Sequence, residues 1–264
     1  MNRIDHTFQT LAATNRKALI AYLTAGDPDF DTSLKILRAA CDAGVDVLEI
    51  GVPFSDPTCD GPVIQEASAR ALKNGMSLSR SFALAAELRK QTQTPLVLFS
   101  YYNPLFKYGL QRVADEASAA GVDGMLVVDC PPEEAGPLAE VLKKKNIHLI
   151  RLAAPTTRPE RIKKLADGAG GFLYLISRMG VTGTGGLDYA EVAKHAAEVK
   201  TLCPLPVCIG FGISTAKDVA ALAPMADGII VGSALVRVIA EAPDAKNLPE
   251  RVAAKIRELR KCMD

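Results

Sequence analysis

Short apolar runs alternate with segments of helical periodicity along the whole chain. A strand that is buried on both faces of a parallel sheet reads as an almost continuous hydrophobic run. Strands are predicted on this basis at 18–24, 45–51, 95–101, 122–128, 147–152, 172–176, 206–209 and 227–231. Apolar residues three and four apart predict helices at 2–14, 32–43, 63–74, 78–90, 133–145, 159–166, 188–202 and 215–223. One more helix should end at 120 after a turn at 102–104, and a final helical region with breaks at Pro243 and Pro249 follows 232.

Eight strands that alternate with helices predict an α/β fold of the (β/α)8 (TIM) barrel type. The pattern adds an extra helix at the N-terminus and another after the second strand, and no linker is visible, so we predict one domain over residues 1–264. The main alternative is a doubly wound open sheet. Against it, the first strand-to-helix turn, at 25–29, lacks a G-x-G-x-x-G motif. A weak repeat, Ala-Gly-Val-Asp at 43–46 and 120–123 and Ala-Asp-Gly at 226–228, marks points where a helix closes and a strand starts.

One carboxylate interrupts the apolar pattern. Glu49 lies deep within the run at 45–51, where a doubly covered strand calls for Val or Leu. Burying Glu49 without a partner would be costly and would raise its pKa. The residues alone leave two explanations open. Glu49 serves in chemistry, or it pairs with a Lys or Arg or points out of the end of the strand.

Further candidate residues gather where the predicted strands end, which is where barrel enzymes place their active sites. Asp60 follows the strand of Glu49, Tyr101 ends the third strand, and Tyr174 lies in the sixth. Apolar residues at the same rim could line a pocket for a flat apolar group, although several of them taken singly are more typical of core. They are Tyr22, Phe99, Leu126, Val128, Phe211 and Ile213.

Three glycine-rich turns follow strands six, seven and eight, at 182–186, 210–214 and 231–234. Glycine lets backbone N–H groups approach a phosphate oxygen, and a helix N-terminus favours an anion. Barrels frequently bind phosphate with the loops after strands seven and eight. These turns contain no lysine, so we expect backbone amides to hold a phosphorylated ligand.

Composition narrows the possible functions. The 264 residues carry 31 basic and 30 acidic side chains, a net charge of +1, which gives no reason to expect nucleic acid or an anionic membrane as a partner. The N-terminus lacks the apolar segment of a secretion signal, and no apolar run approaches the ~20 residues of a membrane span. We therefore expect a cytoplasmic protein. Six scattered cysteines and three distant histidines predict reduced thiols and no metal site.

Several motifs together resemble the tryptophan synthase α subunit family. Leu-Glu-Ile-Gly-Val-Pro-Phe-Ser-Asp-Pro at 48–57, followed by Asp-Gly-Pro-Val-Ile-Gln at 60–65, is similar to the signature of that family. The resemblance continues in the family's order through 24–28, 101–104, 177–183, 210–214 and 232–234, and so spans nearly the whole chain. Other phosphate-binding barrels share the late glycine turns but not the stretch at 48–65. The absence of tryptophan from the chain fits a tryptophan-biosynthetic enzyme.

The resemblance implies the retro-aldol cleavage of indole-3-glycerol phosphate to indole and glyceraldehyde 3-phosphate, in the last steps of L-tryptophan biosynthesis. By the family motif, Glu49 does the acid–base work, Asp60 accepts the indole N–H, and Tyr174 supports them. An apolar strand would raise the pKa of Glu49, while Asp60 would stay ionised in a polar loop. The expected substrate-binding residues are Tyr22, Phe99, Tyr101, Leu126, Val128, Thr182, Gly183, Phe211, Gly212, Gly232 and Ser233.

The resemblance also implies a partner. The family's enzyme works with a β subunit, in an αββα complex, and the β subunit holds pyridoxal phosphate, so no cofactor is expected in this chain. The loops at 53–60 and 178–188 would close over substrate and face that partner. A stand-alone indole-3-glycerol phosphate lyase remains an alternative. A catalytically impaired barrel that only activates a partner is a second alternative, against which the presence of both Glu49 and Asp60 argues.

Departures from the family pattern are few. Thr58 and Cys59 stand where an apolar residue and Ala are usual, just before Asp60. Tyr22 and Phe99 replace commoner pocket residues, and the glycines at 185–186 add flexibility to the second loop. These differences concern the catalytic rate and loop closure more than the type of reaction.

Overall fold

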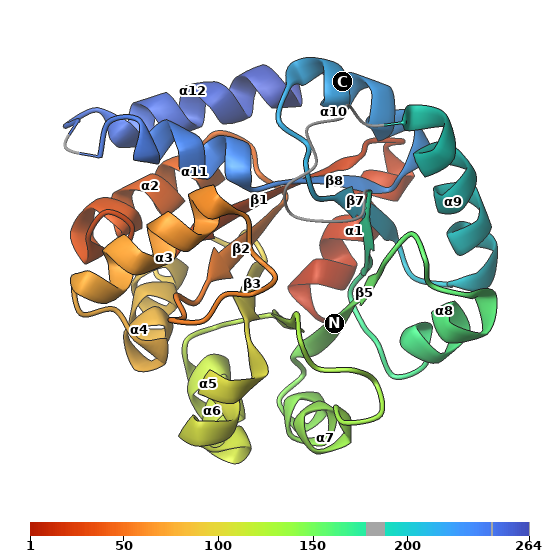
Figure 1. Cartoon of the computed structure of the whole chain (residues 1–264), viewed down its shortest axis with the longest axis horizontal. Helices are drawn as coiled ribbons and strands as arrows, with labels where there is room; N and C mark the ends of the chain where they lie inside the picture. The colour runs from red at the N-terminus through yellow and green to blue at the C-terminus, as the bar shows by residue number, and fades with distance from the viewer. Residues whose placement is uncertain (178–187, 244, 264) are drawn as a thin grey trace.

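Eight parallel strands close into a barrel in the order in which they occur along the chain (Figure 1). The computed structural model describes residues 1–177, 188–243 and 245–263. The first strand pairs with both the second and the eighth, so the sheet closes on itself. This confirms the predicted (β/α)8 barrel and excludes the doubly wound open sheet. The strands are β1 (Ala18–Thr24), β2 (Val47–Gly51), β3 (Leu96–Ser100), β4 (Gly124–Val127), β5 (His148–Ala153), β6 (Leu173–Ile176), β7 (Val207–Gly210) and β8 (Gly228–Val231).

Helices cover the outside of the barrel and one of its ends (Figure 1). In the described residues they are α1 (Arg3–Ala13), α2 (Phe30–Asp42), α3 (Pro62–Lys73), α4 (Leu78–Arg89), α5 (Tyr102–Tyr108), α6 (Leu110–Ala119), α7 (Gly136–Lys144), α8 (Pro159–Ala166), α9 (Tyr189–Leu202), α10 (Ala216–Leu222), the 3₁₀ helix η1 (Ala223–Met225), α11 (Ser233–Ala240) and α12 (Leu248–Arg260). Both predicted extra helices are present: α1 precedes the barrel, and α3 and α4 both lie between β2 and β3. None of the helices in the described part of the chain is long and apolar enough to cross a membrane.

Two predictions about helices were wrong. The turn at 102–104 and the single helix after it are replaced by α5 and α6, which meet at Gly109. Gly109 has a φ of 95°, a conformation that glycine adopts without a Cβ clash, and it caps both helices. Pro249 is not a break either. It lies in the first turn of α12, where a proline removes no helical hydrogen bond.

Residues along each strand alternate between two hydrophobic cores. One core lies inside the barrel and includes Val47, Val97, Leu126, Ile150, Cys208 and Ile230. The other lies between the strands and the surrounding helices. Helix α1 adds Ile4, Phe8 and Leu11 to the inner core, with the ring of Phe8 5.7 Å from that of Phe172. The N-terminal mouth of the barrel is thereby filled with side chains.

The acidic positions of the weak repeat tie neighbouring strands together at this N-terminal mouth. Asp46, Asp123 and Asp227 each precede a strand, and each accepts a hydrogen bond from the backbone N–H of an adjacent strand. The donors are Leu19 at 2.8 Å, Leu96 at 2.9 Å and Val207 at 2.9 Å. The repeat therefore marks a structural device at the start of strands β2, β4 and β8.

Candidate active site

Glu49 lies in the middle of β2 with its side chain inside the barrel. Val47 belongs to the inner core while Leu48 and Ile50 belong to the outer one, so strand alternation turns Glu49 inward. Glu49 is 1% exposed, and its Oε1 has no hydrogen-bond partner within the described part of the chain. Burial raises the pKa of Glu49 from 4.5 to about 8. Glu49 therefore does not point out of an exposed strand end, and it forms no ion pair within the described residues. With this pKa the carboxyl group is mostly protonated at neutral pH.

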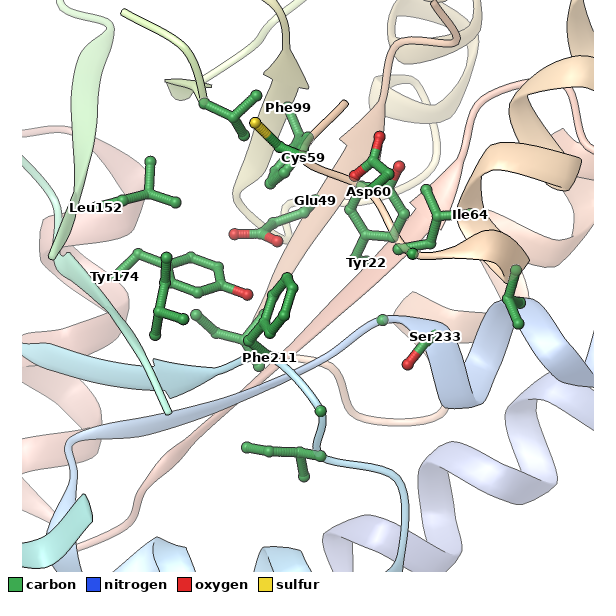
Figure 2. A pocket seen from close by; sticks show the side chains of 18 of the residues that line it. Tyr22, Glu49, Cys59, Asp60, Ile64, Phe99, Leu152, Tyr174, Phe211 and Ser233 are labelled. Carbon is green, nitrogen blue, oxygen red and sulfur yellow. The ribbon is translucent and has the colours of Figure 1, made fainter. Parts of the chain in front are cut away.

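Two tyrosines flank Glu49 (Figure 2). Tyr22 of β1 is its register partner, and Tyr174 reaches in from β6. Each phenol lies over a glycine of the next strand: a Cβ at Gly51 would collide with the hydroxyl of Tyr22, and a Cβ at Gly210 with the hydroxyl of Tyr174. Burial, together with the nearby carboxylates, raises the pKa of both tyrosines well above the usual value. Both therefore remain neutral and keep a hydroxyl proton to donate.

Asp60 lies in the loop after β2, which folds back over the barrel. Tyr101 donates a hydrogen bond from its hydroxyl to Asp60 Oδ2 at 3.1 Å, and the same hydroxyl accepts one from the Cys59 N–H at 2.9 Å. Asp60 is 7% exposed, so it is more buried than its polar loop led us to expect. Burial raises the pKa of Asp60 from 3.8 to about 6, and the Tyr101 hydrogen bond opposes this rise. At pH 7 Asp60 is thus mostly ionised while Glu49 is mostly protonated.

Both carboxyl groups open onto one cavity of about 290 Å³. Its apolar walls come from Val63, Ile64, Phe99, Val128, Leu152, Ile176, Phe211, Ile213 and Ile230. The rings of Tyr22 and Phe99 meet edge to face, 5.1 Å apart with an interplanar angle of 77°. Apolar walls with a few convergent polar groups are typical of a site for a small molecule.

The predicted phosphate-binding turns contribute a polar end to this cavity. Gly212 follows β7, while Gly232 and Ser233 follow β8 and begin α11, whose N-terminal N–H groups can receive an anion. Phe211 has a φ of 83°, which is uncommon for a residue with a side chain, and its carbonyl accepts a hydrogen bond from the hydroxyl of Ser177. Two predicted contacts, Thr182 and Gly183, lie outside the described residues.

Two predicted substrate-binding residues do not line the cavity. Leu126 is fully buried in the inner core. Val128, two residues further along the chain, points to the same side and lines the cavity in its place. Tyr101 is 3% exposed, and its hydroxyl donates a hydrogen bond to the carboxylate of Asp60. For Tyr101 the structure indicates a positioning contact instead of a wall of the pocket.

Other lining residues were not anticipated from the sequence. Leu152, Ile176 and Ile230 occupy inward positions near the carboxyl ends of their strands, a signal that strand alternation could have revealed.

Cys59 lines the cavity beside Asp60. Arg237 reaches the cavity from α11, one helical turn beyond Ser233, a spacing that places both residues on one face of the helix.

The barrel, the cavity and two carboxyl groups of unequal pKa define a (β/α)8-barrel enzyme equipped for acid–base chemistry on a substrate that is apolar at one end and anionic at the other. Within the described residues, no group of three or more His, Cys, Asp or Glu side chains is placed to hold a metal ion. Comparison with known proteins identifies the family.

The family model of the tryptophan synthase alpha chain matches residues 8–264. The tryptophan synthase alpha chain of Desulfosudis oleivorans is 52% identical over 258 residues, which cover 98% of this chain and 97% of the relative. The structure of tryptophan synthase subunit alpha from Legionella pneumophila str. Paris has a TM-score of 0.93 at 38% identity and covers 100% of this chain and 99% of its own. A structure of Mycobacterium tuberculosis tryptophan synthase has a TM-score of 0.90 at 33% identity, with coverage of 99% and 98%. This chain belongs to the tryptophan synthase alpha chain family.

Proposed function

We propose that Glu49 and Asp60 carry out, in this chain, the reaction of its family: the carbon–carbon lyase cleavage of indole-3-glycerol phosphate to indole and glyceraldehyde 3-phosphate, in the last steps of L-tryptophan biosynthesis. One observation carries the assignment of Glu49. It is a buried carboxyl group that faces the cavity, and one of its oxygens has no partner within the described residues. Its pKa of about 8 keeps it protonated near neutrality.

The reaction needs one proton moved from oxygen to carbon. The Glu49 carboxyl group gives its proton to C3 of the indole, and the ring becomes an indoleninium cation. The Glu49 carboxylate then takes the proton of the glycerol 3′-hydroxyl. The C–C bond breaks, its electron pair returns to the ring, indole leaves, and the aldehyde forms. Glu49 ends protonated, as it began, and positioned proton transfer of this kind typically contributes ~10²–10⁴-fold to a rate.

Asp60 stabilises the cationic ring. An ionised carboxylate that accepts the indole N–H becomes more favourable as positive charge develops on the ring, so it lowers the barrier more than it strengthens ground-state binding. With a pKa of about 6, Asp60 is mostly ionised at neutral pH. Tyr101 holds it in place through the 3.1 Å hydrogen bond. We assign Tyr174 a supporting role beside Glu49, because its hydroxyl lies within the electrostatic influence of that carboxyl group.

The two ends of the cavity match the two ends of the substrate. Tyr22, Phe99 and Val128 would contact the indole, and the buried cavity would keep water from the indoleninium ion. Backbone N–H groups near Gly212, Gly232 and Ser233 would bind the phosphate, with Phe211 between the two ends. Thr182 and Gly183 remain proposed contacts on the family motif alone.

Every step is a proton transfer or a bond cleavage that carboxyl groups can drive, so we propose that this chain uses no cofactor of its own. Pyridoxal phosphate is expected in a partner β subunit of an αββα complex, as the family membership indicates. We also propose a single domain over 1–264, since α1 and α12 both pack against the barrel units, and a cytoplasmic location in keeping with a biosynthetic family.

The β subunit would cover the surface around α5. Phe106 on that helix is 65% exposed, an unusual state for a large aromatic side chain, and it stacks on Tyr102 at 6.0 Å. This surface adjoins the loop at 53–60, because Phe54 contacts Tyr101 directly before α5 with a ring distance of 5.2 Å. A partner bound here could therefore influence the loop that carries Asp60.

The test is an assay of indole release from indole-3-glycerol phosphate, with and without a cognate β subunit. The proposal predicts turnover that rises when the β subunit is added. Full activity in the isolated chain would favour the stand-alone lyase instead. Absence of turnover in both conditions would favour a barrel that only activates its partner.

A further inference from the structure

Arg237 is the one basic side chain among the described residues that line the active-site cavity. It is an exposed residue of α11 with no hydrogen bond or ion pair to any described residue. Among the described residues, no basic side chain shifts the pKa of Glu49 or Asp60, so Arg237 is not the counter-ion of either carboxylate. Its positive charge is thus available to a ligand.

The position of Arg237 on the helix directs it toward the glycine-rich end of the cavity. Helical side chains tilt toward the helix N-terminus, so each one covers the turn that precedes it. The turn that precedes Arg237 begins at Ser233, which lines the same cavity together with Gly232. Arg237 and Ser233 therefore share one face of α11 and line the same cavity, on the side where the helix begins.

The substrate end expected there carries more charge than amides alone neutralise. A phosphate monoester has a charge of about −1.5 to −2 at pH 7. A helix N-terminus supplies the equivalent of only about half a positive charge. A guanidinium group adds a full charge and can donate two parallel hydrogen bonds to phosphate oxygens.

We propose that Arg237 is a side-chain anchor for the substrate phosphate and determines the preference of the site for a phosphorylated substrate. This inference rests on the proposed function. It also revises the expectation that backbone amides alone hold the anion, because the cation comes from within the helix and not from the glycine-rich loops.

Steady-state kinetics of Arg237→Gln with indole-3-glycerol phosphate test the anchor. We expect KM to rise about tenfold, the loss of one charge-assisted hydrogen bond, with kcat changed less than about twofold. Arg237→Lys should recover most of the affinity because it keeps the charge. The ratio of KM between the Gln variant and wild type should shrink at high salt, which screens an exposed charge.

Arg257→Gln is the matched control, since Arg257 is an exposed arginine of α12 that does not line the cavity. It removes the same charge and should leave KM unchanged. With indoleglycerol, which lacks the phosphate, Arg237→Gln and wild type should have the same kcat/KM. Equal KM values for the two Gln variants on the phosphorylated substrate would overturn the proposal, as would an equal loss on the phosphate-free one.

Failure of the proposed function would look different. Wild type would then release no indole at all. Binding of glycerol 3-phosphate, measured by calorimetry, still decides the role of Arg237 in that case. Weaker binding to Arg237→Gln than to Arg257→Gln supports the anchor, and equal binding or no binding to wild type contradicts it.

Discussion

Glu49 and Asp123 are carboxylates buried to a similar degree toward opposite ends of the same barrel, and their surroundings are opposite. Asp123 is 4% exposed, with Arg3 and Arg89 each 2.8 Å away and a hydrogen bond from the Leu96 N–H at 2.9 Å. Glu49 is 1% exposed and has an oxygen without any partner in the described residues. Burying an unpartnered carboxylate is costly, whereas a well-paired one is tolerated.

The other two acids of the repeat behave like Asp123. Asp46 pairs with Arg260 at 2.9 Å and Asp227 with Lys200 at 2.7 Å. All three lie at the N-terminal mouth, and Glu49 and Asp60 face the cavity at the other mouth. The same side-chain chemistry contributes stability where its charge is matched. We propose that it serves reactivity at Glu49, whose Oε1 has no partner among the described residues. This agrees with the division of labour between the two faces of such barrels.

The largest expected effect is that of Glu49→Gln on activity. The amide keeps the shape of the carboxyl group but can neither give nor take the proton, so kcat for indole release should fall by at least about 10³-fold. Substrate binding, measured by calorimetry, should persist. Near-native turnover in a correctly folded Gln variant would refute the role assigned to Glu49.

The same variant should alter how stability depends on pH. Glu49 binds its proton more tightly when folded, with a pKa of about 8, than at its ordinary value of 4.5. The folded wild type therefore holds more protons between these values, and its free energy of unfolding should fall as pH rises from about 4.5 to about 8. Urea unfolding at several pH values should show this decline in wild type and a smaller one in Glu49→Gln.

Asp123→Asn should have the opposite effect to Glu49→Gln: it should lower the free energy of unfolding and leave kcat unchanged. The substitution leaves Arg89, 13% exposed, without its carboxylate, and removing one partner of such a buried pair costs about 3–5 kcal/mol. The pair with Arg3, which is 41% exposed, adds little to this cost. The free energy of unfolding in urea should fall by roughly that amount. The kcat of the folded fraction should match wild type. A large drop in kcat would contradict the view that the acids at the N-terminal mouth serve stability alone.

Asp60→Asn should reduce kcat by about 10²-fold, because the neutral amide no longer stabilises the cationic ring. In wild type, activity requires Asp60 ionised and Glu49 protonated, so kcat/KM should be bell-shaped, with a rise near pH 6 and a fall near pH 8. In Asp60→Asn, kcat/KM should no longer rise near pH 6 but should still fall near pH 8. If Asp60→Asn instead removed the fall at high pH, Asp60 and not Glu49 would be the group that must be protonated.

Tyr101→Phe should have the smallest effect. Its hydroxyl hydrogen-bonds Asp60 and the Cys59 N–H, so removing it should lower kcat by about tenfold and stability by about 1 kcal/mol. Since the hydrogen bond from Tyr101 lowers the pKa of Asp60, the acid side of the kcat/KM profile should move to higher pH. An unmoved profile would show that Tyr101 does not act through Asp60.

Glu49 was predictable from sequence because its signal is local. Seven neighbouring positions define the apolar run at 45–51, and strand alternation is enough to turn a single acid inward. The order of the strands was predictable for the same reason. The lack of a partner for Glu49 among the described residues could not be predicted, because it depends on which basic side chains the closed barrel brings near.

Features that depend on distant parts of the chain escaped prediction. Asp60 is buried because its loop folds against Tyr101, far away in sequence, and the loop alone reads as polar. Arg237 looks like an ordinary surface cation until the rotation of α11 about its axis is known. The break at Gly109 depends on a positive φ that the sequence pattern does not reveal.

The role proposed for Glu49 is tested most directly by titrating its carboxyl group. Infrared difference spectra between wild type and Glu49→Gln isolate the C=O band of the protonated acid as pH is raised. We expect this band to persist through neutral pH and to disappear with a midpoint near pH 8. A midpoint near 4.5, the ordinary value for glutamic acid, would contradict it, because Glu49 would then have no proton to give to the indole ring at neutral pH.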